Sequence, residues 1–264
     1  MSARLLSSLQ GGVLSLVISN PQARNALHPD IYRDGIAALE RATTEPDVRA
    51  VVIAGEGGNF CAGGDLNRLR GNRSQPPQVQ RASIDVLHEW IVAIRECPRP
   101  VLAAVEGAAA GAGFSLALAC DMVVAARDAR FLMAYVKVGL TPDGGATHWL
   151  GSRLPYPLAY ELVATGNPVG AQRLHALGLV NEITEPGQAL ATAGARAAAL
   201  AAGPSSALAR VKSLLSQRER DALAGQLVLE RESFVASLFD EDAKEGIDAF
   251  LEKRAPNYCR TGRA

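Results

Sequence analysis

The stretch from Val101 to Asp121, VLAAVEGAAAGAGFSLALACD, decides the fold of this chain. Its first five residues, Val101 to Val105, are apolar and have the composition of a buried strand. Small residues follow from Gly107 to Gly113, and an Ala/Leu-rich segment then runs to Cys120. We therefore predict a strand, a tight loop and a buried helix.

The side chains between Ala108 and Gly113 are small, so a ligand could approach the backbone N–H groups closely. The helix N-terminus behind the loop adds partial positive charge. Such a loop suits an oxygen atom that gains negative charge during a reaction. Tight packing of the helix on a sheet explains the same small residues equally well.

Two known motifs match only part of this stretch. Gly111-Ala112-Gly113 begins like a dinucleotide-binding fingerprint, but Leu116 stands where a third glycine is required. Gly113-Phe114-Ser115 begins like the nucleophile elbow of hydrolases, but Ala117 replaces the second glycine. Neither motif is complete.

The composition limits the class of protein. The chain has 264 residues, 48% of them hydrophobic, which is enough for one large or two small domains with a buried core. Acidic and basic residues number 27 each, so no positive excess favours nucleic acid or an anionic membrane as a partner. The four cysteines form no CxxC pair, and we expect neither a metal site nor disulfides. With no secretion signal and no membrane-spanning apolar run, we expect a cytoplasmic protein.

The first half of the chain alternates strands and helices, which favours a layered α/β sheet. The predicted strands are Val13 to Ser19 and Val48 to Ala54, and a helix lies between them from His28 to about Thr43. The segment Gly71 to Gln80 is polar and contains prolines, so we expect a mobile surface loop. A helix follows from Val79 to Arg95.

A second loop of small residues, Asn59 to Leu66, also precedes a predicted helix. Further on, Asp143 lies in the turn from Thr141 to Gly145, at or just before a helix, where an aspartate commonly serves as the N-cap. Of the histidines on predicted helices, we expect His88 to be a packed or cavity-lining residue and His148 to be at most an auxiliary one.

From Ser152 onward the chain becomes mainly helical. We divide it into an α/β core at residues 1–190 and a helical region at residues 191–264. The apolar stripes of the last helices suit a contact with a partner subunit, but they also suit packing on the chain's own core.

Six stretches, in this order, resemble the crotonase superfamily, also called the enoyl-CoA hydratase/isomerase family. They are Asn20-Pro21 to Asn25-Ala26-Leu27, Phe60 to Asp65, Val105 to Asp121, Gly139 to Gly145, Gly178 to Asn181 and Phe250 to Arg254. The resemblance covers nearly the whole chain, from about Val13 to Tyr258. It implies an α/β fold with a crotonase-like ββα repeat core, assembled as a homotrimer or a dimer of trimers.

The resemblance also implies an acyl-CoA thioester as substrate, with coenzyme A as part of that substrate and no separate cofactor or metal. In the family two backbone N–H groups hold the thioester oxygen, and these positions fall on Gly64 and Ala112. Such donors stabilise the negative charge that develops on that oxygen when a proton beside the thioester is removed. The residues implied to contact the substrate are Ala23, Ala62, Gly63, Asp65, Leu66, Ser115, Tyr135 and Lys253.

The chain departs from the family pattern at the two glutamates that activate water in the hydratases. Those positions hold Ser115 and Tyr135, and neither side chain is a good general base at neutral pH. Asp143 matches an aspartate found in a subgroup that resembles the phenylacetate-pathway isomerases. One carboxylate is enough to move a proton between two carbons, so we predict that Asp143 is the general acid/base.

Three functions stay open on the sequence. The first is an enoyl-CoA isomerase that forms a thioester enolate and uses Asp143. The second is an enoyl-CoA hydratase or ring-opening hydrolase, with water held by Asp143 and Tyr135. The third is a non-catalytic acyl-CoA-binding protein that has lost its carboxylates.

Overall fold

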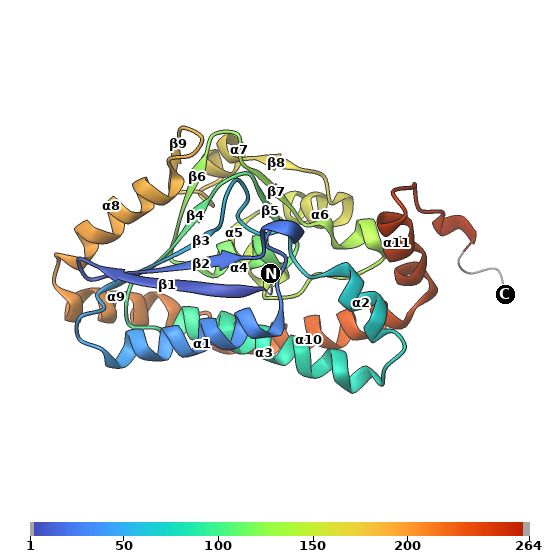
Figure 1. Cartoon of the computed structure of the whole chain (residues 1–264), viewed down its shortest axis with the longest axis horizontal. Helices are drawn as coiled ribbons and strands as arrows, with labels where there is room; N and C mark the ends of the chain where they lie inside the picture. The colour runs from blue at the N-terminus through green and yellow to red at the C-terminus, as the bar shows by residue number, and fades with distance from the viewer. Residues whose placement is uncertain (1–2, 261–264) are drawn as a thin grey trace.

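A six-stranded sheet forms the centre of the structure, a computed structural model that describes residues 3–260 (Figure 1). Its strands lie in the order β1 (Arg4–Gln10), β2 (Val13–Ser19), β3 (Ala50–Gly55), β4 (Val101–Val105), β6 (Met122–Ala126) and β9 (Glu182–Thr184). The pair β1 and β2 is an antiparallel hairpin, and each later neighbouring pair is parallel. Parallel neighbours need crossover connections, which explains why helices alternate with strands.

A smaller sheet continues from the carboxyl ends of the central strands. It contains β5 (Ala108–Ala110), β7 (Arg130–Leu132) and β8 (Val169–Gly170), with β7 in the middle. The pairing of β5 with β7 is parallel, and that of β7 with β8 is antiparallel. This sheet carries the chain from β4 to the loop in front of helix α4 (Ala112–Ala119).

Side chains of the central strands alternate between two hydrophobic layers, as a pleated strand requires. One face of β3 presents Ala50 and Val52 to helix α8 (Ala189–Ala201). That helix buries alanines at every fourth position, Ala189, Ala193, Ala197 and Ala201, so it packs closely on the sheet. Figure 1 shows α8 along this face, at the upper left of the sheet.

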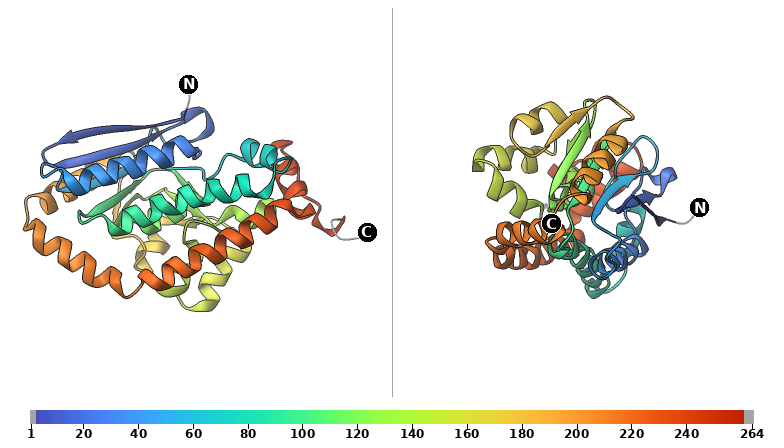
Figure 2. Two further views of the ribbon diagram at one scale, coloured as in Figure 1. Left: turned by 90° about the horizontal axis from the view of Figure 1, so that it is seen from below. Right: turned by 90° about the vertical axis from the view of Figure 1, so that its left-hand side faces the viewer.

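The opposite face carries the main core. It packs against helices α1 (Pro29–Thr44), α3 (Pro77–Glu96) and α4, and every residue of α4 is buried. Figure 2 shows α1, α3 and α10 (Arg220–Phe239) running side by side along the molecule. The remaining helices are η1 (Pro21–Ala23), α2 (Leu66–Asn72), η2 (Ala134–Val138), α5 (Ala146–Arg153), α6 (Tyr156–Thr165), α7 (Ala171–Ala176), α9 (Ser205–Gln217), α11 (Glu241–Leu251) and η3 (Tyr258–Arg260).

The helices at the carboxyl end of the chain pack against the core at two places. Helix α10 contacts α3 and α5, and α11 contacts α2 and η2. The contact of α11 with η2 is so close that a Cβ added to Gly246 would lie 2.4 Å from the carbonyl carbon of Val138. In residues 3–260 no helix has the length and apolar character needed to cross a membrane.

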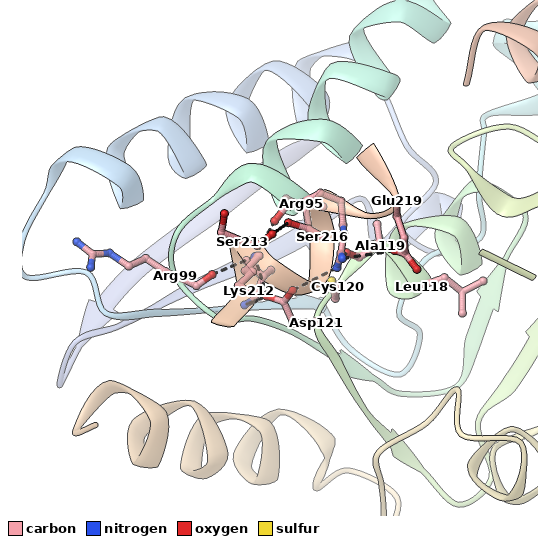
Figure 3. A network of polar contacts seen from close by, with 12 residues as sticks. Arg95, Arg99, Leu118, Ala119, Cys120, Asp121, Lys212, Ser213, Ser216 and Glu219 are labelled. Atoms are coloured by element: carbon pink, nitrogen blue, oxygen red, sulfur yellow. Dashed lines mark hydrogen bonds and ion pairs between the residues drawn. The ribbon is translucent and has the colours of Figure 1, made fainter. Parts of the chain in front are cut away.

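A network of charged side chains ties α9 to the end of α4 (Figure 3). Asp121 accepts hydrogen bonds from Arg95 over 3.2 Å and from the backbone N–H of Val101 over 2.8 Å. Lys212 of α9 approaches the same carboxylate to 2.7 Å and donates to the carbonyl oxygens of Ile94 and Arg99. Because Lys212 is only 10% exposed, these bonds replace its hydration.

The elements predicted from the sequence are present, with three differences. Part of the tight loop predicted before α4 forms strand β5. Strand β1 was not predicted, although Gly11 and Gly12 have φ of 57° and 80°, the conformation of a two-residue hairpin turn. The expected loop at residues 71–80 is wrong in extent, because α2 ends at Asn72 and α3 begins at Pro77. A proline is compatible with the first turn of a helix, and Asn72 donates to Gln80 over 2.7 Å across the short connection.

Candidate active site

The two loops of small residues lie against each other. The N–H of Cys61 donates to the carbonyl of Ala108 over 3.0 Å, and the N–H of Ala110 donates back to the carbonyl of Cys61 over 2.9 Å. Gly63 continues the first loop with φ of 87°, and a Cβ there would lie 2.7 Å from the oxygen of Ala110 and 3.4 Å from the amide nitrogen of Ala112. Only glycine fits this close approach, which brings the two loops to one place.

Two amides beside this contact have no acceptor. Within residues 3–260, neither the N–H of Gly64 nor that of Ala112 donates a hydrogen bond. Their neighbours are paired, since Gly63 donates to the sulfur of Cys61 and Gly111 donates to the carbonyl of Leu132. Ala112 is the first residue of α4, where an N–H has no partner within the helix.

Both amides line one cavity of about 430 Å³. Its wall is mostly apolar and is built by the two loops, by helices α1, α2 and α3, by η2, and by Phe234 of α10 and Phe250 of α11. Among the described residues that line it, Asp143 is the only one with a carboxyl group. The charged side chains on the wall are otherwise basic: Arg24, Arg68 and Lys137.

Asp143 is buried in this wall, with 6% of its surface exposed. Its Oδ1 accepts a hydrogen bond from the hydroxyl of Tyr135 over 2.5 Å. Burial raises the pKa of Asp143 to about 7, and the negative charge of Glu230 adds to this, while the hydrogen bond from Tyr135 and the charge of Arg68 act against it. A carboxyl group with a pKa near neutrality can both accept and return a proton at physiological pH.

Tyr135 is a hydrogen-bond donor and not a base. Burial raises its pKa well above the usual value, and the charge of Asp143 and the hydrogen bond to it raise it further. Ser115 lies behind it, fully buried, and donates to the backbone carbonyl of Asp143 over 2.8 Å. Ser115 therefore fixes the main chain of the Asp143 turn and does not line the cavity.

The turn between Asp143 and α5 is held by a buried glutamate that the sequence did not reveal. Glu230 of α10, 3% exposed, accepts from the N–H of Gly145 over 2.7 Å. It also accepts from the N–H and the hydroxyl of Thr147 over 2.7 and 2.5 Å. These bonds cap the first turn of α5, so Asp143 itself is not needed as the cap.

His88 of α3 is also part of this support. It is buried, and burial lowers its pKa to about 4, so the ring is neutral at pH 7. Its Nε2 accepts a hydrogen bond from the N–H of Gly144 over 3.4 Å. His148 lies outside the cavity, with its ring against Trp149 and its Nε2 buried without a partner in the described chain.

The structure brings most of the predicted site residues together. Those that line the cavity are Ala62, Gly63, Gly64, Leu66, Ala112, Tyr135 and Asp143. Four others do not: Ala23, Asp65, Ser115 and Lys253. Asp65 instead caps α2, because its carboxylate accepts from the N–H of Asn67 over 2.8 Å. Lys253 is exposed beyond the end of α11, and its role toward coenzyme A stays a prediction.

Comparison with known proteins decides the family. Residues 8–261 match the sequence profile described as enoyl-CoA hydratase/isomerase. The chain belongs to this family. The crotonase fold predicted from the sequence is confirmed by solved structures, among them an enoyl-CoA hydratase from Polaromonas sp. JS666. The two share 52% identity with a TM-score of 0.81, over 96% of this chain and 99% of that one.

Relatives in the enoyl-CoA hydratase/isomerase family carry different activities in their names. A probable enoyl-CoA hydratase of Rhodobacter capsulatus is 38% identical over 96% of this chain and 95% of its own length. The 1,2-epoxyphenylacetyl-CoA isomerase of Escherichia coli is 33% identical, over 96% of this chain and 97% of its own. The 2,3-dehydroadipyl-CoA hydratase of the same organism is 34% identical, over 97% and 98%. The chain is therefore a crotonase-family acyl-CoA enzyme of the hydratase or isomerase type.

Proposed function

We propose that this enzyme is an enoyl-CoA isomerase, which moves a double bond along the acyl chain of a CoA thioester by proton transfer. In this proposal the N–H groups of Gly64 and Ala112 hold the thioester oxygen. Asp143 removes a proton from C2 of a 3-enoyl-CoA, and the electron pair moves onto that oxygen as an enolate. Asp143 then returns the proton at C4, which leaves the double bond between C2 and C3.

The observation that carries the proposal is a single carboxyl group with a near-neutral pKa in the cavity that both free amides line. One acid/base suffices when the proton leaves and returns on the same face of the substrate. Hydration by the family pattern needs two glutamates, and those positions hold Ser115 and Tyr135. The mostly apolar wall lowers the local dielectric and so strengthens hydrogen bonds to the developing oxyanion.

The Asp143→Asn variant tests the proposal. It keeps the size of the side chain and its bond from Tyr135, but it cannot accept a proton. We expect conversion of 3-enoyl-CoA to 2-enoyl-CoA to fall by at least about a hundredfold, while the ester still binds. Asp128→Asn, at an exposed position, is the matched control. Unchanged turnover in Asp143→Asn would remove this residue from the mechanism.

Hydratase activity is the second candidate, because the names of several relatives say hydratase. Here Asp143 and Tyr135 would hold the attacking water. Reaction in ¹⁸O-labelled water separates the two, since hydration places the label in the product and isomerisation does not. An ester that binds tightly without hydrogen exchange at C2 or C4 would favour a non-catalytic binding protein.

We also propose that the enzyme assembles as a homotrimer or a dimer of trimers. Apolar side chains of the last helices are exposed on the single chain, including Leu214 and Leu215 of α9 and Leu229 of α10. Exposed apolar residues gathered on helices commonly become subunit contacts. Light scattering on the purified protein measures the assembly, and a monomeric mass would contradict it.

A further inference from the structure

Arg68 places a positive charge on the cavity wall without an acidic partner. The side chain is half-buried, and its Nη1 donates to the hydroxyl of Ser83 over 2.9 Å. Its Nε is buried with no partner in the described chain, and no described carboxylate lies within 4.0 Å of the guanidinium. A partly desolvated charge with unused donors is costly unless a ligand pairs with it.

The groups around Arg68 are suited to an anion. Ser83 and Gln80, both on α3, line the same cavity as Arg68, and Ser83 accepts its hydrogen bond. Gln80 is 3% exposed, and its oxygen already accepts from Asn72 over 2.7 Å. Its remaining hydrogen-bonding group is the amide NH₂, a donor. The apolar side chains of Leu69 and Ile84 line the same cavity.

The position of Arg68 separates it from the other cations of the cavity. Arg24 and Lys137 are exposed, whereas Arg68 is half-buried against α1 and α3. It lies in the first turn of α2, directly after the loop that carries Gly64. Burial raises the pKa of Tyr32 and of Asp143, and the charge of Arg68 acts against that rise at both groups. Arg68 also forms a hydrogen bond with the phenol of Tyr32, so the guanidinium is near the proposed reaction centre.

We propose that Arg68, with Ser83 and Gln80, binds a carboxylate at the far end of the acyl chain, so that the enzyme prefers CoA monoesters of short dicarboxylic acids. A carboxylate accepts two parallel hydrogen bonds from a guanidinium. The inference rests on the proposed function, because it takes the thioester oxygen to lie at Gly64 and Ala112. An acyl chain then runs from that point toward Arg68.

Two other roles for Arg68 make different predictions. If Arg68 serves only as a counter-charge for Asp143, its substitution changes the affinity for esters with and without a terminal carboxylate equally. If Arg68 binds a phosphate of coenzyme A, its substitution also changes the affinity for all esters equally, because every ester carries that phosphate. A preference between esters that differ only at the end of the acyl chain therefore distinguishes the proposal from both.

Binding of unreactive saturated esters gives the first measurement. By titration calorimetry, we expect the wild type to bind adipyl-CoA at least about tenfold more tightly than hexanoyl-CoA. Arg68→Met should abolish this preference and leave the affinity for hexanoyl-CoA within about threefold. Arg70→Met, on the same helix but outside the cavity wall, should keep the preference. Equal affinities in the wild type, or equal losses for both esters in Arg68→Met, would overturn the proposal.

Turnover of the matching unsaturated esters separates this inference from the proposed function. The pair is 3-hexenoyl-CoA and the CoA monoester of 3-hexenedioic acid. If the wild type isomerises neither ester but keeps its binding preference, the isomerase proposal fails and the carboxylate subsite stands. If it isomerises both with equal kcat/KM and Arg68→Met slows both alike, the isomerase stands and the subsite is wrong.

Discussion

The hydroxyl of Tyr135 donates a hydrogen bond of 2.5 Å to the carboxylate of Asp143, and Ser115 holds the main chain of the same aspartate. Burial and Glu230 favour the protonated form of Asp143, while Tyr135 favours the ionised form. The pKa of about 7 is the balance of these opposing effects. Glu230 and Tyr135 act on the pKa of Asp143 in opposite directions, so substituting them should move the pH dependence of activity in opposite directions.

Tyr135→Phe removes the hydrogen bond that stabilises ionised Asp143. The pKa of Asp143 should therefore rise further, and the pH at which kcat/KM falls to half on the acid side should move up by about one unit. Tyr160→Phe, the same change at an exposed position outside the cavity, is the matched control. A midpoint that stays in place in Tyr135→Phe would show that Asp143 is not the group that titrates.

Glu230→Gln should move the same midpoint downward by about half a unit to one unit, because the repulsive negative charge near Asp143 is removed. It should also lower the free energy of unfolding by about 1–3 kcal/mol, since an amide cannot accept all the bonds from Gly145 and Thr147. Glu232→Gln, which loses only exposed ion pairs with Arg81 and Arg231, should leave the midpoint in place and lower the free energy of unfolding much less than Glu230→Gln does. An upward shift in Glu230→Gln would contradict the electrostatic explanation.

Asp143→Asn should make the protein more stable at high pH. The folded pKa of about 7 lies above the usual aspartate value of about 3.9, so the folded protein keeps a proton on Asp143 that the unfolded chain releases. The wild type therefore loses stability as the pH rises from about 4 to 7. At pH 8 the variant should exceed the wild type by roughly 2–4 kcal/mol, and near pH 4 the two should be equal. Urea unfolding at both pH values measures this. A constant difference between them would show that Asp143 has an ordinary pKa when folded.

Lys212→Met should destabilise the fold without changing the chemistry. It leaves the carbonyl groups of Ile94 and Arg99 without their donor and weakens the pairing of Asp121 (Figure 3). We expect a loss of about 2–4 kcal/mol in denaturant unfolding and unchanged activity per folded molecule. Arg210→Met, exposed on the same helix, should cost less than about 0.5 kcal/mol.

The local patterns in the sequence predicted the elements that carry the two loops. The apolar run at residues 101–105 and the small residues after it became β4, β5 and the start of α4. Strand β1 was missed, although Gly11 and Gly12 mark its hairpin with β2. This signal was available, because two adjacent glycines are typical of a two-residue hairpin turn.

The support around Asp143 could not be predicted in the same way. Glu230 and Arg68 lie on helices whose periodicity indicates burial but not which group each residue meets. The contact of Glu230 with the Asp143 turn depends on how α10 crosses α5, a long-range packing relationship. The role of Asp65 as the cap of α2 could have been predicted from the sequence, because the residue comes directly before the helix. The family resemblance had implied a substrate contact there instead.

A crystal structure of the enzyme with a bound unreactive acyl-CoA tests most directly whether the amides of Gly64 and Ala112 hold the thioester oxygen. We expect the thioester oxygen to lie within about 2.7–3.1 Å of the amide nitrogens of both Gly64 and Ala112. We also expect C2 or C4 of the acyl chain to lie next to the carboxylate of Asp143. A thioester oxygen that contacts neither amide, or an acyl chain that lies away from Asp143, would contradict the proposed mechanism.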